Sequence, residues 1–417
     1  TVELYEMRPS VMTPAHKTGD FAELVCSNSL KSEDIETSSG LLKAELRLFD
    51  SLILSCADKA KVPAGSALSV ERRGFSAAVK DALTGFGGLT ITEREVKDIA
   101  EVFPLDGEIL IIAAGPLISD ALAKSLAGLT GGDFLYFFDA AAPIVSAESI
   151  DYGRAFFASR YGKGDASDYL NCPLDKDEYA RFYTALISAE CAPVRGFESQ
   201  VFSGCMPVEV MARGGGDALR FGPMKPVGIY DADGKRPYAV VQLRKENAAA
   251  TMYNLVGFQT HLTFGEQRRV FSMIPALREA EFLRYGVMHR NSFINAPAVL
   301  DETFSFKDKS GGRGRIFVAG QLSGVEGYVE SAMSGLIAAE NALRVLQNKP
   351  YFRIPDTTMT GALCRYISGG DPKGFQPMNS NFGLLPPLAE NIKDKKKRKA
   401  AYAERALSDL RDCLDGR

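Results

Sequence analysis

The stretch "GRIFVAGQLSGVEGYVESAMSGLIAAENAL", residues 314–343, is the part of the sequence that most constrains the fold. A short apolar run meets Gly320, and Gly324, Gly327 and Gly335 follow, the last among small residues at helical spacing. Glycines at a strand-to-helix turn let the backbone approach a pyrophosphate, and the helix N-terminus supplies amide donors. The segment predicts a buried strand, a ligand-side turn and a helix packed closely on a sheet. An ordinary strand–helix unit without a ligand is the simpler interpretation.

The beginning of the chain predicts a second part of the same site. "TVELYEMRP", residues 1–9, alternates like a strand and ends in Glu6. In a dinucleotide-binding fold, such an acid ends the second strand and hydrogen-bonds the ribose. The glycine-rich turn expected before this strand is absent, because the sequence starts where the second strand would.

A further apolar run supports this interpretation. "GEILIIAAGP", residues 107–116, has the form of a buried parallel strand that meets a ligand-side turn. An early ribose acid combined with a late glycine-rich turn fits flavoproteins whose FAD domain is made of both chain ends. The sequence therefore predicts FAD as a cofactor.

Composition limits the class of protein. With 417 residues, of which 46% are apolar, the chain predicts two or three domains with a large core. A net charge of −3 gives no global sign of nucleic-acid binding, so an RNA partner would need a local basic patch. No window reaches about 18 uninterrupted apolar residues, and no charged leader precedes an apolar run. We expect no membrane span, no secretion signal and a cytoplasmic protein.

The cysteines and histidines predict neither disulfides nor a metal. Seven cysteines without any CxxC pair argue against a disulfide framework and a zinc site. His16, His261 and His289 are not at metal-ligand spacing from one another. For most of these thiols, a small buried hydrophobic role is the simplest interpretation.

Segments along nearly the whole chain resemble one known family. They are "LVCSNSLKS" at 24–32, "AAGPL" at 113–117, "FFDAAAPIV" at 137–145, "FSGCMPVEVMA" at 202–212, "FGPMKPVG" at 221–228, "AVVQLRKEN" at 239–247, "GVMHRN" at 286–291, "AGQLSGVEGYVESAMSG" at 319–335 and "PMNSNFGLLPPL" at 377–388. In this order they resemble the TrmFO family, the folate- and FAD-dependent tRNA (uracil-5-)-methyltransferases, which are relatives of the larger GidA-type flavoproteins. The missing N-terminal glycine-rich turn is the one large departure.

The resemblance implies a specific reaction. A uridine in the T-loop of tRNA becomes 5-methyluridine, with 5,10-methylenetetrahydrofolate as carbon donor, reduced FAD as hydride donor and NADH or NADPH to recharge the flavin. A thiolate that adds at uracil C6 makes C5 nucleophilic, and the transferred methylene carbon needs two more electrons to become a methyl group. The expected partners are tRNA and the small-molecule folate and nicotinamide, with no membrane and no metal. The sequence does not determine an oligomeric state.

Two cysteines receive different roles from the resemblance. It points to Cys205 as the nucleophile that forms the uracil adduct. In "SGCMP", Gly204 and Pro207 suggest a tight, exposed turn, although a cysteine at a buried turn is the simpler interpretation of that segment alone. The resemblance places Cys26 at the flavin, as a residue that shapes the pocket.

The remaining site residues are predicted from motif and resemblance together. The cofactor-binding set is Glu6, Arg8, Gly115, Gly320, Gln321, Gly324, Gly327, Tyr328 and Asn381. The substrate-binding set is His289, Arg290 and Asn291 in "MHRN", with Lys396, Lys397 and Arg398 at the start of a C-terminal helix, where they can contact RNA phosphates. The simpler interpretations are a polar turn at "MHRN", an asparagine that caps its own backbone, and a solvated basic helix face.

The predicted fold class is α/β. A Rossmann-like FAD-binding domain is made from both chain ends, with a first part at 1–169 and a second part with C-terminal helices at 301–417. An inserted α+β substrate domain spans 170–300. In it, "CPLDKDEYARFYTALISAE" and "EQRRVFSMI" read as helices, and "YAVVQLRKE" and "MYNLVGF" as strands.

Two functional alternatives stay open at this point. One is the same chemistry on a uridine of ribosomal RNA. The other is a flavoprotein that binds RNA without methylating it.

Overall fold

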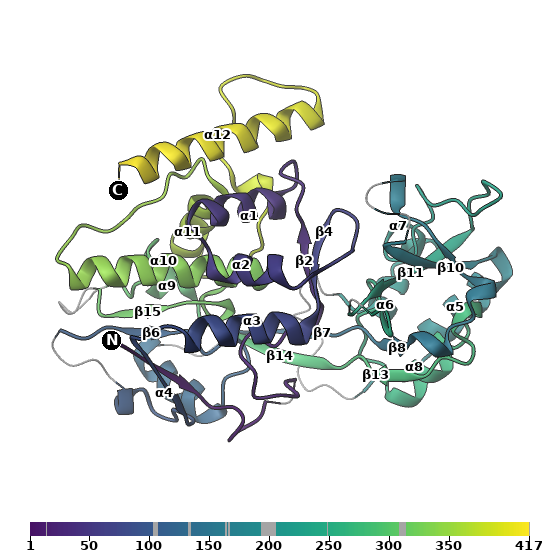
Figure 1. The fold of residues 1–417 in the computed structure, drawn as a ribbon, viewed down its shortest axis with the longest axis horizontal. Helices are drawn as coiled ribbons and strands as arrows, with labels where there is room; N and C mark the ends of the chain where they lie inside the picture. Colours follow the sequence, from purple (N-terminus) through teal and green to yellow (C-terminus); the bar gives the residue numbers. More distant parts are fainter. Residues whose placement is uncertain are drawn as a thin grey trace.

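Two apolar clusters organise the chain. The computed structural model describes residues 1–13, 15–102, 107–131, 135–162, 165, 167–192, 206–247, 249–307 and 314–416, and leaves aside the side chains of 135–140 and 288–290. One cluster runs from Leu24 to Leu126 and again from Phe293 to Ala406, while the other lies between Val145 and Ala280. The two bodies lie side by side in Figure 1. Residues from both ends of the chain therefore contribute to one apolar cluster.

The first body combines short sheets with long helices. Its strands form a parallel pair β1–β5, a parallel pair β6–β15 and an antiparallel sheet β2–β4–β3. Their bounds are β1 Val2–Glu6, β2 Ser29–Ser32, β3 Lys61–Val62, β4 Ala67–Val70, β5 Leu89–Glu93, β6 Leu110–Ile112 and β15 Ile316–Val318. The longer helices are α1 Ser38–Leu48, α2 Leu52–Lys59, α3 Arg72–Thr84, α4 Asp120–Thr130, α10 Tyr328–Leu346, α11 Met359–Gly369 and α12 Lys395–Asp415. Two predicted strands of the nucleotide site, β1 ending at Glu6 and β15 before Gly320, are thus present.

The second body is built on one antiparallel sheet. Six strands lie in the order β13–β8–β12–β11–β10–β9. Their bounds are β8 Ile144–Ser146, β9 Phe156–Phe157, β10 Tyr169–Leu174, β11 Ala239–Lys245, β12 Met252–Leu255 and β13 Phe282–Arg284. Its main helices are α5 Lys176–Ile187, α6 Val208–Ala212 and α8 Phe264–Phe271.

One predicted helix in this body begins too early. Residues 172–174, taken from sequence as helical, belong to β10, where they pair with β11. The helix α5 starts only after Asp175, whose side chain accepts from the Glu178 amide while the Glu178 carboxylate accepts from the Asp175 amide. This reciprocal cap is a local start signal that the sequence contains.

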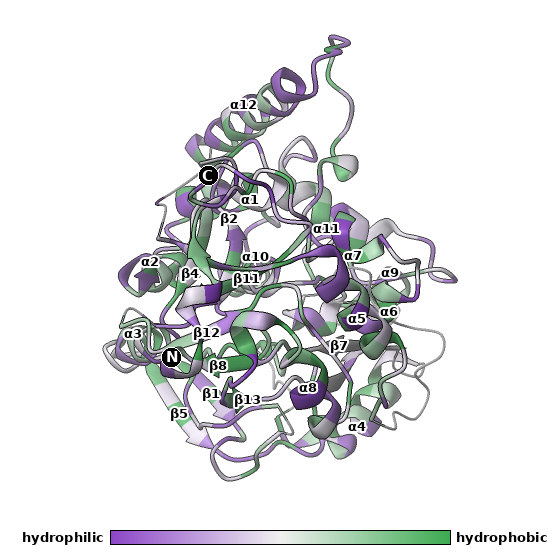
Figure 2. Ribbon diagram, turned by 90° about the vertical axis from the view of Figure 1, so that its right-hand side faces the viewer, coloured by the Kyte–Doolittle hydropathy of each residue, from purple (hydrophilic) through white to green (hydrophobic). Residues whose placement is uncertain are grey.

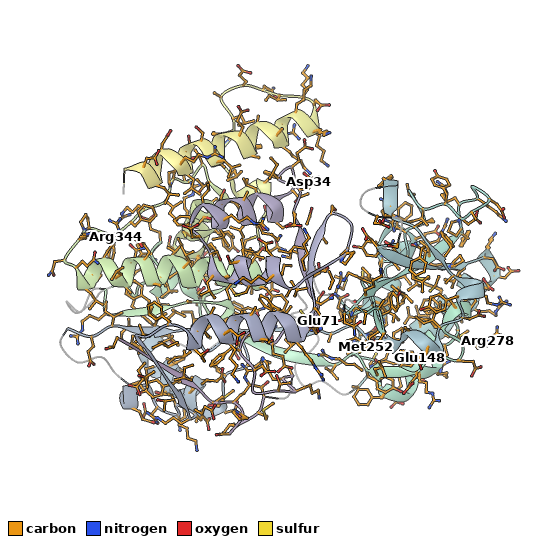
Figure 3. All side chains as sticks on the ribbon, viewed as in Figure 1. Asp34, Glu71, Glu148, Met252, Arg278 and Arg344 are labelled. Atoms are coloured by element: carbon orange, nitrogen blue, oxygen red, sulfur yellow. The ribbon has the colours of Figure 1, made fainter. Side chains whose placement is uncertain are left out.

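The chain passes between the two bodies on a pair of strands. β7 Leu135–Ala140 and β14 Met288–Phe293 are antiparallel, and each continues into or out of the six-stranded sheet. Figure 3 places Glu71, the N-cap of α3, on the side of the first body that faces the second. The domain boundaries at 169 and 300 remain predictions. No helix in the described ranges is long and apolar enough to cross a membrane.

A buried carboxylate joins the two ends of the chain within the first core. Glu45 on α1 is fully buried and accepts hydrogen bonds from the amides of Met359 and Thr360, at 2.7 and 2.8 Å, and from the Thr360 hydroxyl at 2.7 Å. These donors lie at the start of α11. Burial raises the pKa of Glu45 from 4.5 to about 7, although the hydrogen bonds act to lower it.

We expect this group to make stability depend on pH. Between pH 4.5 and 7 the folded protein keeps the Glu45 proton while the unfolded chain releases it, so the free energy of unfolding falls as pH rises through this window. The loss approaches about 3 kcal/mol and levels off above the folded pKa. The glutamine of Glu45→Gln cannot ionise. As pH rises from 5 to 8, the denaturation midpoint of wild type should therefore fall relative to that of Glu45→Gln. Glu404→Gln, at an exposed carboxylate, is the control and should show no such difference. Parallel pH profiles for Glu45→Gln and wild type would contradict the assignment.

Candidate functional site

The turn between β15 and α10 has the backbone that its glycines predict. Gly320, Gly324 and Gly327 have φ values of 75°, 89° and 113°, a region that glycine enters without strain. Gly327 is the N-cap of α10, and no side chain caps the helix there. A Cβ built on Gly320 would meet no atom within 4 Å. The turn therefore has open space at Gly320, while Gly324 and Gly327 pack closely against the side chains of Phe375 and Glu330.

Another predicted segment, residues 377–388, lies against this turn. Met378 pairs with it in parallel, because its amide donates to the Gly324 carbonyl at 2.9 Å and its carbonyl accepts from the Glu326 amide at 2.8 Å. Three residues on, the Asn381 side chain accepts from the Gly383 amide at 3.1 Å. Asn381 thus caps its own turn, the simpler of the two interpretations, close to the predicted cofactor turn.

The strand β14 connects the AAGP turn to the glycine-rich turn. The Ser292 amide donates to the Pro116 carbonyl at 2.8 Å, and the Ile294 amide donates to Leu322 at 2.9 Å. Gly115 has a φ of 71° and open space at its Cβ position. Asn291 is buried at 4% exposure on the same strand. The structure therefore brings Gly115 and Asn291 to the turn that precedes α10.

Cys26 lies at the start of α10. Its Sγ is 3.1 Å from the Tyr328 hydroxyl oxygen, and its amide donates to that oxygen at 3.1 Å. Burial, and then the neighbouring Cys26, raise the pKa of Tyr328 well above its usual value, so the phenol keeps its proton. Because the phenol oxygen accepts from the Cys26 amide, its own hydrogen is available to the sulfur. Two predicted site residues 302 positions apart are thus in direct contact.

Three arginines donate hydrogen bonds to residues 24–28, which we call the Cys26 loop. Arg72 donates to the Leu24 carbonyl, Arg284 donates to the Val25 carbonyl, and Arg244 donates to Ser27 Oγ at 2.8 Å and to Asn28 Oδ1 at 3.0 Å. Arg72 comes from α3 of the first body, and the other two from β11 and β13 of the second. We call Arg72, Arg244 and Arg284 the arginine cluster. Sequence reasoning missed all three, and only Arg244, inside the quoted segment "AVVQLRKEN", lay in a region with a signal.

The arginine cluster carries more positive than negative charge. Glu246 pairs with Arg72 at 2.7 Å. Burial opposes the charge on Arg72, but the Glu246 carboxylate outweighs it and raises the pKa of Arg72. Burial, followed by the nearby Arg72 guanidinium, lowers the pKa of Arg284, and burial lowers that of Arg244. An anionic group placed here would relieve this accumulation of charge.

Glu6 and Arg8 contact each other at the end of β1. Arg8 Nη2 lies 3.1 Å from one Glu6 oxygen, and the Arg8 Nε and amide donate to the other at 3.1 and 2.9 Å. Arg8 also lies 3.6 Å from Glu23. The predicted ribose acid is therefore oriented by its neighbour.

Some predicted residues are not placed. Cys205, the predicted nucleophile, lies outside the described residues, as do the side chains of His289 and Arg290. The chain resumes at Met206, directly before α6.

The predicted basic run occupies the first turns of α12. Lys396, Lys397 and Arg398 follow the N-cap Asp394. Lys396 is 80% exposed and only 4.0 Å from the nearest acid, Glu36. Figure 2 shows α12 at the edge of the molecule, with hydrophilic and hydrophobic residues alternating along its ribbon. Lys396, Lys397 and Arg398 are all exposed.

Comparison with known proteins agrees with this arrangement. The family model described as "Glucose inhibited division protein A" matches residues 1–350. The structure is similar to that of Aquifex aeolicus GidA in its form I crystal, with a TM-score of 0.66 at 13% identity over 99% of this chain and 71% of the other. At that identity the likeness concerns the fold alone.

Sequence relatives are closer. The methylenetetrahydrofolate--tRNA-(uracil-5-)-methyltransferase TrmFO of Heliobacterium modesticaldum is 56% identical over 98% of this chain and 91% of its own length. The protein of the same name from Desulforudis audaxviator is 55% identical, over 98% and 92%. The chain belongs to the TrmFO family. The resemblance predicted from the sequence is confirmed, and the TrmFO chain has the mixed α/β fold of its GidA relatives.

The contact between Cys26 and Tyr328 predicts the reactivity of this TrmFO thiol. Tyr328→Phe removes the hydroxyl that can donate to Sγ, so a smaller fraction of Cys26 should exist as thiolate at fixed pH. Alkylation of Cys26 should slow by roughly 2- to 10-fold, the equivalent of one hydrogen bond. The rate is read by mass spectrometry of the peptide that contains Cys26. Tyr366→Phe is the control, because the Tyr366 hydroxyl, on α11, donates to the Gln376 carbonyl at 2.8 Å. An unchanged or faster rate in Tyr328→Phe would show that the hydroxyl does not donate to Cys26.

Proposed function

We propose that this protein methylates C5 of a uridine in the T-loop of tRNA, with 5,10-methylenetetrahydrofolate as carbon donor. The observation that carries the proposal is the meeting of Cys26, Tyr328 and the glycine-rich turn at an electropositive junction of two bodies. The names of the closely similar TrmFO relatives support tRNA and folate as partners.

The glycine-rich turn fits FAD. Gly115 and Gly320 combine positive φ with open space at Cβ, and the amides at the start of α10 have no side-chain cap. These are the features that a pyrophosphate or a flavin ring edge requires of a protein backbone. In the proposal, Gly320, Gln321, Gly324, Gly327 and Tyr328 line the cofactor. Glu6 and Arg8, with Gly115 and Asn381, complete the set. When bound and reduced by NADH or NADPH, FAD supplies the hydride that turns a methylene group into a methyl group.

The arginine cluster has a clear task in this scheme. Reduced flavin, folate carboxylates and RNA phosphates are all anionic, and each would be favoured beside these buried guanidinium groups, of which Arg72 is paired with Glu246. Because two of these arginines come from the second body and one from the first, an anion bound there also holds the bodies in register. Cys26 shapes this pocket in the proposal and does not attack the base.

Cys205 is the proposed nucleophile. Its Sγ forms a bond to uracil C6, the electron pair moves to C5, and C5 forms a bond to the folate methylene carbon. Loss of the C5 proton then expels tetrahydrofolate by breaking the bond between its nitrogen and the methylene carbon, and a hydride, which reduced FAD would supply, converts the resulting exocyclic methylene into a methyl group. Breakage of the Sγ–C6 bond restores the C5–C6 double bond of the uracil and the thiolate. The target base must leave its stack to reach the thiol. His289, Arg290 and Asn291 are proposed to contact the folate or this base.

The first experiment tests methylation and separates the two thiols. Full-length protein is charged with FAD, NADH or NADPH and methylenetetrahydrofolate, then given unmodified tRNA and ribosomal RNA transcripts, and nucleosides are read by mass spectrometry. We expect 5-methyluridine in tRNA, and a fall of about 10⁴-fold or more in Cys205→Ala, as for loss of a covalent nucleophile. Cys26→Ala should instead change the flavin absorption spectrum and weaken FAD retention, which Cys205→Ala should leave intact.

Cys413→Ser, a half-buried thiol on α12, is the matched control and should keep full activity. If only the ribosomal transcript is methylated, the proposed reaction stands but its substrate is ribosomal RNA, and the proposal of tRNA is wrong. If the protein retains FAD that can be reduced but methylates neither RNA, it is a flavoprotein and the proposed methyltransferase activity is refuted.

The basic end of α12 predicts how tRNA binding depends on salt. Replacing Lys396, Lys397 and Arg398 with alanine removes three cations, so the slope of log affinity against log salt should fall by about 2. Affinity should weaken equally for different tRNA sequences, because phosphate contacts do not read bases. A filter-binding titration at several salt concentrations measures both quantities.

The control removes three exposed lysines from the opposite side of the first body, Lys80, Lys97 and Lys124. They lie on or near α3 and α4, away from α12 in Figure 1. Equal effects of the two triple variants would show that α12 makes no special contact and that only net charge matters.

A further inference from the structure

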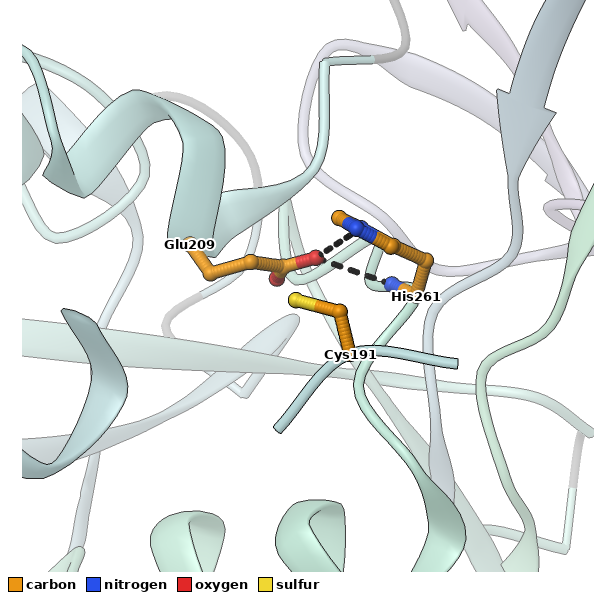
Figure 4. A group of neighbouring side chains, drawn as sticks. All are labelled: Cys191, Glu209 and His261. Atoms are coloured by element: carbon orange, nitrogen blue, oxygen red, sulfur yellow. Dashed lines mark hydrogen bonds and ion pairs between the residues drawn. The ribbon is translucent and has the colours of Figure 1, made fainter. Parts of the chain in front are cut away.

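Three potential metal ligands meet in the second body, away from the arginine cluster. Cys191 Sγ, a carboxylate oxygen of Glu209 and a ring nitrogen of His261 all lie within 4.8 Å of one another. Figure 4 shows them facing a common point from three different segments. Glu209 and His261 are buried, at 0% and 5% exposure, and Cys191 is half-buried. No spacing in the sequence indicates this group, because the fold alone assembles it.

The backbone around these residues is tightly paired. The Ala192 amide donates to the His261 carbonyl at 2.7 Å, and the Val208 amide donates to the Gln259 carbonyl at 2.7 Å. The stretch from Gln259 to His261 is therefore hydrogen-bonded to Ala192, which precedes residues 193–205, and to Val208, which follows them. Cys191 and Glu209 lie on these two sides, so whatever joins them also joins the two ends of that segment.

The chemistry of the three donors suits a transition metal. A thiolate, an imidazole and a carboxylate are the ligand types that Zn²⁺ prefers, and three such ligands with one open position are typical of catalytic zinc sites. The carboxylate of Glu209 is oriented by the Thr260 hydroxyl at 2.8 Å and by the His261 amide at 2.9 Å. Metal-binding carboxylates usually have such outer hydrogen bonds. The two anionic ligands would balance a divalent charge.

The distances show what ion binding would change. Glu209 Oε1 and His261 Nδ1 are 2.5 Å apart, as a hydrogen-bonded pair. Two ligands of one tetrahedral zinc lie about 3.4 Å apart, given metal–ligand distances near 2.1 Å. The two side chains would open by about 1 Å, which small side-chain rotations provide. Arg213, whose Nη2 is 4.0 Å from Cys191 Sγ, is a cation beside the group and lies at its exposed edge.

We propose that Cys191, Glu209 and His261 bind one divalent transition-metal ion of the Zn²⁺ class. The bound ion links Cys191, which precedes residues 193–205, to Glu209, which follows them. Its binding is independent of the proposed methylation, since the metal content can be measured without RNA or folate.

The test uses the full-length, FAD-loaded protein. Each variant is incubated with Zn²⁺, dialysed exhaustively against metal-free buffer and analysed by mass spectrometry for zinc and for FAD. We expect about one zinc per chain in wild type and in the control Cys413→Ser. Cys191→Ser should lose affinity by at least about 100-fold, since loss of a ligand exceeds the effect of losing an outer hydrogen bond. Equal FAD retention and circular dichroism would show that the variant is folded.

Substitution with Co²⁺ gives a second and direct measurement. Cobalt bound to a thiolate shows a sulfur-to-metal charge-transfer band, which wild type should have and Cys191→Ser should lack. If wild type retains no zinc and shows no thiolate band with cobalt, the proposal is refuted, and the group is a hydrogen-bonded pair beside a thiol. Zinc retained equally by Cys191→Ser would refute it as well, by placing the ion elsewhere.

Discussion

A buried ion pair between Arg72 and Glu246 connects the two bodies, and the geometry of the candidate site depends on it. The Arg72 Nε lies 2.7 Å from the carboxylate of Glu246, which is 2% exposed. Removing both charges from water costs several kcal/mol, and attraction repays this only when the geometry is correct. The pair therefore contributes more to the relative placement of the two bodies than to net stability. Since Arg72 also holds the Leu24 carbonyl, the position of Cys26 follows from it.

The site collects positive potential in a protein whose net charge is negative. Tyr328, the first residue of the 19-residue helix α10, contacts Cys26 through its hydroxyl, and three guanidinium groups reach the same loop from elsewhere. Helix dipoles and guanidinium groups both favour anions, and they act most strongly where water is excluded. A chain with a net charge of −3 can thus attract anionic cofactors and RNA locally.

Local sequence signals predicted the elements that need only neighbouring residues. The strand that ends at Glu6, the turn from Gly320 to Gly327 and the basic start of α12 all appear at the expected places. Each rests on backbone or pairing preferences that act over a few residues. The helix expected from residue 172 onward was wrong at its beginning, because pairing with β11 places residues 172–174 in a strand. Tertiary pairing there outweighed a helical pattern that the reciprocal cap at Asp175 had already limited.

The sequence by itself determined the family, the glycine-rich turn and the set of residue types available for chemistry. Family segments and glycine conformations are properties of the chain in order, so they can be read without coordinates. Only the tertiary structure decided which of these residues meet. It brought Cys26 to Tyr328, assembled the arginine cluster from α3, β11 and β13, and gathered Cys191, Glu209 and His261. Contacts of this kind depend on how two cores pack and how strands pair across long separations, which no spacing rule in the sequence encodes.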